Sequence, residues 1–145
     1  MIRTALAVVA IAVGVTAVVA QSDPIATRKQ LMKEMGAQTK TGAGMAKGEA
    51  PYDQAKAQQI LANYVDTATK APTLFPDNSK TGGDTAALPA IWQNMGDFKG
   101  KFDKFGAEAK AAQGTVKDAD TFKAAFGGLT KNCGACHETY RAKKS

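Results

Sequence analysis

The 145-residue sequence is poor in several kinds of residue, and each shortage excludes a class of protein. Two cysteines are too few for a disulfide-rich scaffold, and one histidine is too few for a histidine-rich metal site. Five prolines and fourteen glycines exclude a low-complexity chain. The 19 Lys and Arg outnumber the 13 Asp and Glu, but no long run of one charge occurs, so nucleic-acid binding is not indicated. A single globular domain is the expected organisation.

The first 20 residues differ in composition from the rest of the chain. Arg3 is their only charged residue, a long apolar run follows it, and small residues end that run at Ala20. This pattern predicts a cleaved secretory signal peptide over residues 1–20 and a mature domain over residues 21–145. An uncleaved anchor is the alternative, yet the run is shorter than the ~20 residues that span a bilayer. In a Gram-negative bacterium the signal peptide would direct the protein to the periplasm, and no membrane attachment is expected after cleavage.

Beyond residue 20, no stretch shows the alternating β-branched pattern of a strand, so the domain is expected to be all-α. Four segments carry apolar residues at helical spacing, and capping or proline residues mark their starts. We expect these helices over residues 24–42, 53–72, 88–114 and 118–145, the first one losing its pattern at the glycines at 42, 44 and 48.

Two short links and one long link join these helices, which favours an antiparallel up-down-up-down four-helix bundle. The long link, from Thr73 to Ala87, is rich in Gly, Asp, Asn and Pro. A structureless link of this length usually packs beside a functional site, and a plain solvent loop is the alternative. The apolar residues Leu74 and Phe75 are expected to anchor the link in the bundle.

The segment from Cys133 to His137 reads Cys-Gly-Ala-Cys-His, which is the attachment sequence of c-type haem. On a helix, positions i, i+3 and i+4 share one face, so two thiols can add to the two haem vinyl groups while the imidazole reaches the iron. Three different sites could also use these residues. A thioredoxin-like dithiol needs a βαβ setting, zinc needs a fourth ligand, and a disulfide between Cys133 and Cys136 leaves His137 unexplained.

A haem motif near the C-terminal end of the last helix of a four-helix chain resembles the class II cytochromes c, the family of cytochrome c′ and its low-spin relatives. The resemblance covers residues 21–145 and is carried by Arg28 with Leu31-Met32-Lys33, and by residues 47–53, 74–76, 89–92 and 133–141.

This resemblance implies one covalently bound haem c, with thioether bonds at Cys133 and Cys136 and with His137 as the proximal iron ligand. It also implies that a side chain of the first helix covers the distal face. Cytochrome c′ has no protein ligand on that face, whereas the low-spin relatives place a methionine sulfur on the iron. Met32 matches the position of that methionine.

The geometry of a bundle supports Met32 independently of the family. In an antiparallel bundle the start of the first helix lies beside the end of the last helix. Met32 lies eight residues after Pro24, which is roughly 12 Å along the axis at 1.5 Å per residue. His137 lies at a similar distance from the end of the fourth helix. A core methionine that only lines the pocket is the alternative to ligation.

Four further residues are candidates for the surroundings of the haem. Arg28 could pair with a haem propionate, or it could be a solvated surface arginine. Arg141 matches a family position beside the proximal imidazole, and a cation in a last helical turn also suits the helix dipole without any function. Phe75 and Trp92 are expected to pack near the macrocycle, although typical cytochrome c′ chains carry a further aromatic residue near Thr73 that is missing here.

The sequence thus favours a periplasmic monohaem c-type cytochrome that carries one electron at a time. A five-coordinate protein of the cytochrome c′ type, which binds nitric oxide or carbon monoxide, is the alternative. No enzyme is expected, because the chain has no second histidine for acid/base work.

The expected partner is a redox protein that docks at an exposed haem edge. Within its last fifteen residues the chain has more bases than acids, which favours an acidic partner. The charged residues concerned are Lys131, Arg141, Lys143 and Lys144, against Glu138. Family members form dimers through their first two helices, yet those apolar stripes show no surplus surface, so monomer and homodimer both stay open.

Overall fold

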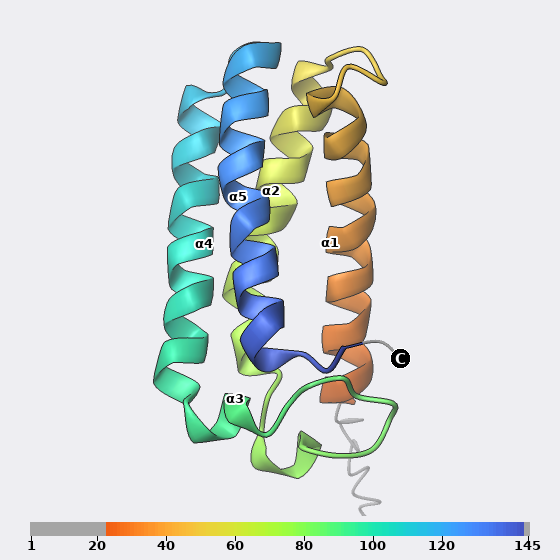
Figure 1. The fold of residues 1–145 in the computed structure, drawn as a ribbon, viewed down its shortest axis with the longest axis vertical. Coiled ribbons are helices and arrows are strands. Elements are labelled where there is room, and N and C mark those ends of the chain that lie inside the picture. Colours follow the sequence, from red (N-terminus) through yellow and green to blue (C-terminus); the bar gives the residue numbers. More distant parts are fainter. Residues whose placement is uncertain (1–22, 144–145) are drawn as a thin grey trace, which may run out of the picture.

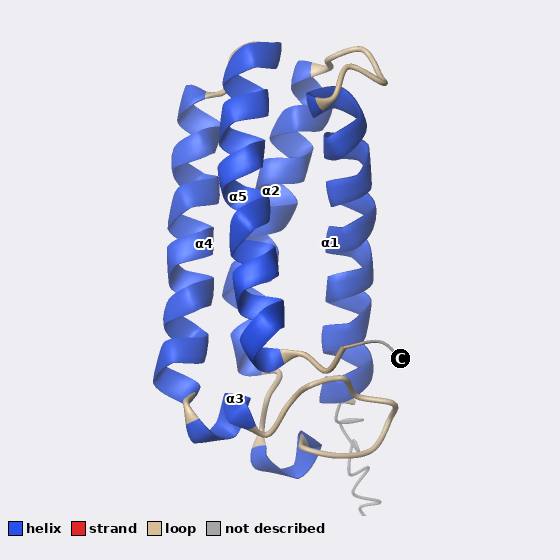
Figure 2. Cartoon of the chain, viewed as in Figure 1, coloured by secondary structure: helices blue, strands red, loops and turns tan. Residues whose placement is uncertain are grey.

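Four long helices form an antiparallel bundle in this computed structural model, which describes residues 23–143 (Figure 1). The predicted signal peptide over residues 1–20 lies outside the described residues. The long helices are α1 (Pro24–Ala46), α2 (Gln54–Lys70), α4 (Met95–Thr115) and α5 (Ala119–Tyr140). The prediction of an all-α up-down-up-down bundle is confirmed, and Figure 2 shows helices and loops alone over the described part of the chain.

Aspartates cap α1, α2 and α5, three of the four long helices, where the sequence predicted helix starts. Asp23 Oδ1 accepts a hydrogen bond of 2.9 Å from the backbone N–H of Ile25, and Pro24 takes the first helical position. At α5 the carboxylate of Asp118 accepts from the backbone N–H of Thr121 at 2.9 Å. The Thr121 hydroxyl in turn accepts from the backbone N–H of Asp118 at 3.1 Å, which completes a capping box.

The first helix is longer than predicted. Gly42 and Gly44 weaken the sequence pattern, but both lie inside α1, which is capped at Lys47. The chain turns at Gly48, whose φ of 75° is a left-handed conformation that favours glycine. Gly42 is buried in α1 and leaves no room for a side chain, since a Cβ there would stand 2.4 Å from Cε2 of Phe126.

The prediction of one continuous third helix was wrong. The structure has a short helix, α3 (Ala90–Gln93), then a break at Asn94 with φ −130° and ψ 47°, and then α4. Helix α3 buries Ile91, so the helical spacing of apolar residues continues across the break and conceals it in the sequence. The helical spacing of apolar residues predicted for this segment continues in α4, where Phe98, Phe102 and Phe105 are all buried.

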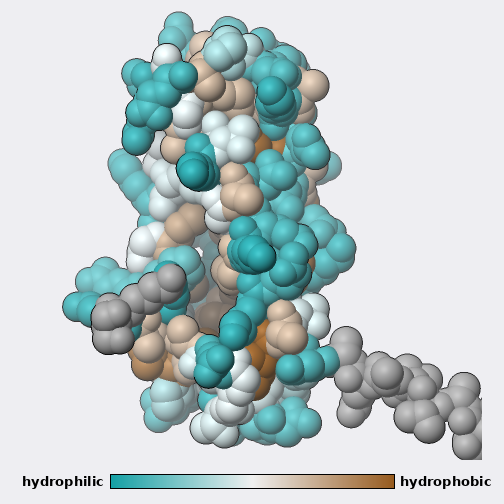
Figure 3. All heavy atoms as spheres, turned by 90° about the vertical axis from the view of Figure 1, so that its right-hand side faces the viewer, coloured by the Kyte–Doolittle hydropathy of each residue, from teal (hydrophilic) through white to brown (hydrophobic). Residues whose placement is uncertain are grey.

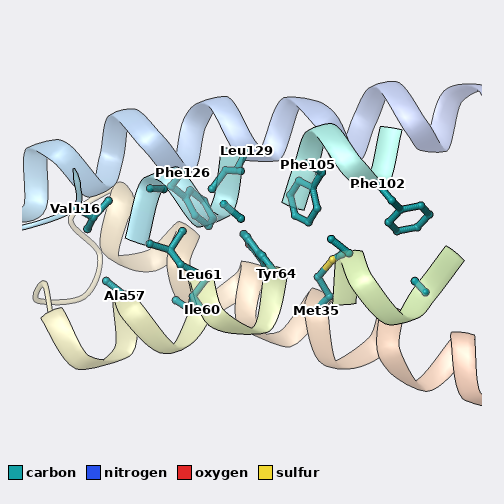
Figure 4. Close-up of a cluster of buried hydrophobic side chains, with 14 of the residues drawn as sticks. Met35, Ala57, Ile60, Leu61, Tyr64, Phe102, Phe105, Val116, Phe126 and Leu129 are labelled. Atoms are coloured by element: carbon teal, nitrogen blue, oxygen red, sulfur yellow. The ribbon is translucent and has the colours of Figure 1, made fainter. Parts of the chain in front are cut away.

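The core runs along the bundle axis between the four long helices, and Figure 4 shows part of it around Tyr64. The Tyr64 side chain is fully buried, its hydroxyl shares a hydrogen bond of 2.8 Å with that of Thr39, and its ring centroid lies 5.3 Å from that of Phe105. Tyr64 therefore joins three helices at mid-bundle. None of the described helices has the length and apolar character that crossing a membrane requires.

The long link between α2 and α3 is ordered across the end of the bundle where α1 begins and α5 ends (Figure 1). The Leu88 N–H donates to the Tyr140 carbonyl at 3.0 Å, and the Ala142 N–H donates to the Ala86 carbonyl at 2.8 Å. The link also contains two short 3-10 turns, Ala71–Thr73 and Asp77–Ser79. It is therefore neither structureless nor a plain solvent loop.

Candidate haem-binding site

The predicted haem motif lies near the C-terminal end of α5, at the lower end of the bundle in Figure 1. Cys133 and Cys136 are half-buried free thiols, so the disulfide considered for this pair is not formed. Cys136 packs against the hydrophobic core, whereas the adjacent His137 is exposed. Because positions three apart share one side of a helix, α5 turns both thiols toward the bundle interior.

The protonation states of the motif suit covalent attachment and metal ligation. Burial raises the pKa of both the Cys133 and the Cys136 thiol, so each carries its proton at neutral pH. Desolvation lowers the pKa of His137, and the nearby Arg141 cation lowers it further. The imidazole is therefore neutral at pH 7, which is the form that binds a metal ion.

Contacts with α4 fix the last turn of α5. Tyr140 is buried, its hydroxyl donates a hydrogen bond to Asp97 Oδ2, and its ring centroid lies 5.2 Å from that of Phe98. The bond to Asp97 raises the pKa of Tyr140 to about 12, so the hydroxyl keeps its proton. Asp97 also pairs with Lys101 at 3.6 Å. These contacts fix the direction in which the preceding turn presents His137.

Met32 lies in the third turn of α1, half-buried and packed against the hydrophobic core. Met35 is almost completely buried less than one turn further along α1, and Met45 is buried near the other end of that helix. Of these three methionines, Met32 lies closest to the N-terminal end of α1, which faces the end of α5. This placement agrees with the predicted position of the distal side chain.

A close contact between α1 and α5 sets the level of Met32 relative to the motif. A Cβ built on Gly42 would stand 2.4 Å from Cε2 of Phe126, so these two residues face each other. The two helices are antiparallel, and ten residues from this contact are Met32 on α1 and Cys136 on α5. At 1.5 Å per residue both lie about 15 Å from the contact. Met32 is therefore level with the haem motif.

Arg28 is buried, with 4% of its surface exposed, which excludes the solvated surface arginine. Its two terminal nitrogens donate four hydrogen bonds of 2.7–2.9 Å to the long link. The acceptors are the Leu74 carbonyl, the hydroxyl and carbonyl of Ser79, and the Thr85 hydroxyl. The guanidinium carbon also lies 4.5 Å from the centre of the Phe75 ring. Arg28 thus ties α1 to the link.

Phe75 and Trp92 lie together at the same end of the bundle. Their ring centroids are 5.9 Å apart, and the Trp92 indole N–H donates to the Phe75 carbonyl at 3.0 Å. Phe75 also packs edge-on against Phe98 of α4, at 4.7 Å between centroids. Arg141 caps α5, where its backbone N–H donates to the His137 carbonyl at 3.2 Å, and its side chain is exposed. The structure thus gathers all the predicted site residues at one end.

A hollow opens in the lower half of the face shown in Figure 3, with apolar surface inside it and both apolar and hydrophilic surface along its rim. This half contains the start of α1 and the end of α5, and hence Met32 and the two thiols. A covalent haem needs two free thiols on one helix face with open space beside them. The residues present therefore fit such a group.

Residues 23–141 match a family model described as Cytochrome C′. The chain belongs to the class II cytochromes c. It is 54% identical over 127 residues to cytochrome c′ of Rhodopseudomonas palustris, covering 88% of this chain and 87% of that protein. Cytochrome c-556 of the same organism is 36% identical, with 99% of both chains covered. The predicted family is confirmed, and as a class II cytochrome c the chain binds one covalently attached haem c.

Solved structures of these two relatives share the fold. The R. palustris cytochrome c′ structure gives a TM-score of 0.83 and covers 86% of this class II cytochrome and 100% of its own chain. A structural model of oxidised cytochrome c556 from that organism gives 0.79 at 36% identity, with coverages of 86% and 100%. The four-helix arrangement around the motif is thus that of the family.

The fold gives no support to a thioredoxin-like dithiol or a zinc site at the motif. Both cysteines lie in a helix of an all-helical bundle, which is not the βαβ setting of a thioredoxin-like dithiol. Over residues 23–143, no group of three or more His, Cys, Asp or Glu side chains is placed to hold a metal ion.

Two residues that shape the site were not predicted from the sequence. Asp97 gives no sequence signal, because its bond to Tyr140 joins residues that are far apart in the chain. The position of Gly42 could have been recognised from the spacing of apolar residues in the sequence. It falls on the buried stripe of α1 together with Met35 and Met45, at spacings of seven and three, which marks an inward-facing glycine.

Proposed function

We propose that this class II cytochrome is a periplasmic one-electron carrier. In this proposal Cys133 and Cys136 would hold the haem by thioether bonds, and His137 and Met32 would ligate its iron. When bound, the haem supplies a reversible one-electron couple between Fe(II) and Fe(III). Because electron transfer makes and breaks no bond in a substrate, we propose no enzymatic role.

The contact between Gly42 and Phe126 is the observation that carries this proposal. Counted from this contact at a constant helix rise, Met32 and Cys136 are at the same level, which supports Met32 as the second ligand. A thioether from Met32 would then be available as a second ligand of the iron beside His137. The chain has no second histidine that could take this position instead.

The remaining side chains of the site would hold and orient the cofactor and shield it from water. The bond between Tyr140 and Asp97 fixes the turn that carries His137. The rings of Phe75 and Phe98, which pack edge-on at this end of the bundle, would present apolar surface to the haem and help to keep water from it. Apolar surroundings and a soft thioether ligand both favour Fe(II) over Fe(III), so we expect Met32 to raise the reduction potential.

The substitution Met32→Ala tests the proposal through the visible absorption spectrum of the holoprotein. We expect a six-coordinate, low-spin iron in the wild type and a five-coordinate, high-spin iron that binds carbon monoxide in the variant. Met45→Ala is a matched control, because it removes a buried methionine of the same helix far from the motif. It should lower stability and leave the spin state unchanged.

A second candidate function is the capture of nitric oxide or carbon monoxide by a five-coordinate iron. The 54% identity to a protein named cytochrome c′ favours it. In this case the wild-type spectrum would already be high-spin, and Met32→Ala would leave it unchanged. That result would contradict the carrier proposal and support the gas-binding one.

The periplasmic location rests on the predicted leader. The solved R. palustris cytochrome c′ chain is covered completely, while 86% of this chain is matched. The unmatched part amounts to about 20 residues, the length of the predicted signal peptide. N-terminal sequencing of the exported holoprotein tests this assignment, and we expect a mature chain that begins at Gln21.

A further inference from the structure

We propose that Gly42 is a positioning residue for Met32: its missing side chain sets the spacing of α1 and α5 that brings the sulfur to the iron. This inference rests on the proposed ligation by Met32. Gly42 is buried, and a Cβ at this position would stand 2.4 Å from Cε2 of Phe126 and 3.0 Å from Cδ2 and Cζ of the same ring. Any side chain therefore acts as a wedge between the two helices.

The Phe126 ring is buried in the core and packed against a second buried ring. It is only 5% exposed, and its centroid lies 5.3 Å from that of Phe122, which is 1% exposed. The Phe122 ring in turn lies 5.9 Å from Tyr52, in the segment just before α2. In a close-packed interior of this kind, added volume moves the backbone as well as side chains. We therefore expect α1 to move away from α5.

A displacement at Gly42 reaches Met32 because α1 is one unbroken helix from Pro24 to Ala46. Relief of a 2.4 Å approach to ordinary contact at 3.4 Å requires a shift of about 1 Å. A functional group that must lie within about 0.5 Å of its productive position does not tolerate a shift of that size. The sulfur of Met32 would thus lose part of its bonding to the iron.

Two further glycines of α1 provide matched controls within the same helix. A Cβ at Gly36 would meet nothing within 4 Å, and one at Gly44 would meet only the Ala50 Cβ at an ordinary 3.8 Å. Gly36→Ala makes the same chemical change as Gly42→Ala, and it lies closer to Met32. It should raise helix propensity and leave the distance between α1 and α5 unchanged.

The experiment compares wild type, Gly36→Ala, Gly42→Ala and the double variant Gly42→Ala with Phe126→Leu, all as holoproteins. The measurements are the spin state by visible absorption and the rate of carbon monoxide binding. For Gly42→Ala we expect a high-spin fraction and a binding rate about tenfold higher or more, as overpacking shifts the ligation equilibrium. Gly36→Ala should behave as wild type. In the double variant the smaller Leu should make room for the Ala methyl and restore the low-spin spectrum.

Several results would overturn the inference. Gly42→Ala with a wild-type spectrum would mean that the Phe126 ring yields without moving α1. A double variant that stays high-spin, or that fails to fold when Gly42→Ala also fails, would mean that the change damages the core generally. A wild type that is high-spin from the start would instead refute the proposed ligation, and this inference with it. The wild-type spectrum thus separates the two failures.

Discussion

At the scale of single residues, Arg28 shows how a buried cation can hold a loop in place. Burial of a charged group is costly unless its donors find acceptors. Here the acceptors are backbone carbonyls and hydroxyls of the long link, and an aromatic face covers the guanidinium. All four N–H groups on its terminal nitrogens are occupied, so the predicted bond to a propionate would have to use the Nε–H or replace one of these bonds.

Arg28→Ala should destabilise the holoprotein, because it leaves buried acceptors of the link without their donors. We expect the free energy of unfolding to fall by about 2–4 kcal/mol in urea titrations. Lys33→Ala, an exposed cation on the same helix, should change it by less than about 0.5 kcal/mol. Equal effects of the two substitutions would refute the role of Arg28 in fastening the link.

The two cysteines should each contribute one covalent bond to the haem. After Cys133→Ala or Cys136→Ala we expect one thioether to persist, so that the haem resists acid-acetone extraction but one of its vinyl groups stays free, whereas the double variant should release its haem completely. The reason is that both thiols lie on one face of α5 and each can reach a single vinyl group. Retention of haem by the double variant, or a pyridine haemochrome spectrum of the single variants that shows no free vinyl group, would rule out this pair of attachment sites.

At the scale of helices and loops, the sequence predicts what depends on short-range spacing and misses what depends on packing between helices. The cap at Asp118 and the haem motif follow from residues within five positions of one another, and both were predicted. The break at Asn94 escaped prediction because the apolar spacing continues across it. The role of Gly42 depends on Phe126, 84 positions away, and no local pattern contains that pairing.

The ordered conformation of the long link also depends on packing between segments that are far apart in the sequence. Its composition predicts a loop, but its conformation is fixed by Arg28 from α1 and by backbone bonds to the end of α5. The sequence contains each of these residues without showing that they meet. The level of Met32 could be estimated because helix rise is constant, which makes axial position the one long-range quantity that residue counting provides.

The pairing of α1 with α2 through Tyr64 predicts a loss of stability at alkaline pH. Burial raises the pKa of Tyr64 from 10.0 to about 12. Because the folded-state pKa is higher than the unfolded one, the protonated Tyr64 hydroxyl stabilises the folded state relative to the ionised one. This stabilisation is complete below pH 10 and is lost as the pH rises through about 12. Tyr64→Phe should therefore flatten the decline in Tm between pH 10 and 12. An unchanged slope in thermal unfolding would contradict this origin.

At the scale of the whole molecule, net charge and its placement bear on docking. The full chain carries a formal charge of +6, and Lys131, Arg141 and Lys143 are exposed on or just beyond the second half of α5. Lys144, the fourth predicted base, lies outside the described residues. A basic surface beside the proposed haem pocket favours an acidic redox partner.

Electron transfer to an acidic partner protein should slow as ionic strength rises, because salt screens the attraction that steers the encounter. Lys143→Glu should lower the rate in low salt in stopped-flow measurements. Lys117→Glu makes the same charge change at the opposite end of the bundle, where α5 begins, and should have a smaller effect. Rates that are independent of salt would remove electrostatic docking from the proposal.

The position of Trp92 makes the protein report on its own folding by fluorescence. It is the single tryptophan of the chain, and its indole is held against Phe75 at the end of the bundle that carries the haem motif. A nearby haem absorbs the emission of an excited indole by energy transfer, so the folded holoprotein should be almost dark. Unfolding moves Trp92 away from the attachment site on α5, and emission should then rise. Folding and unfolding can therefore be followed in the native chain without an added dye.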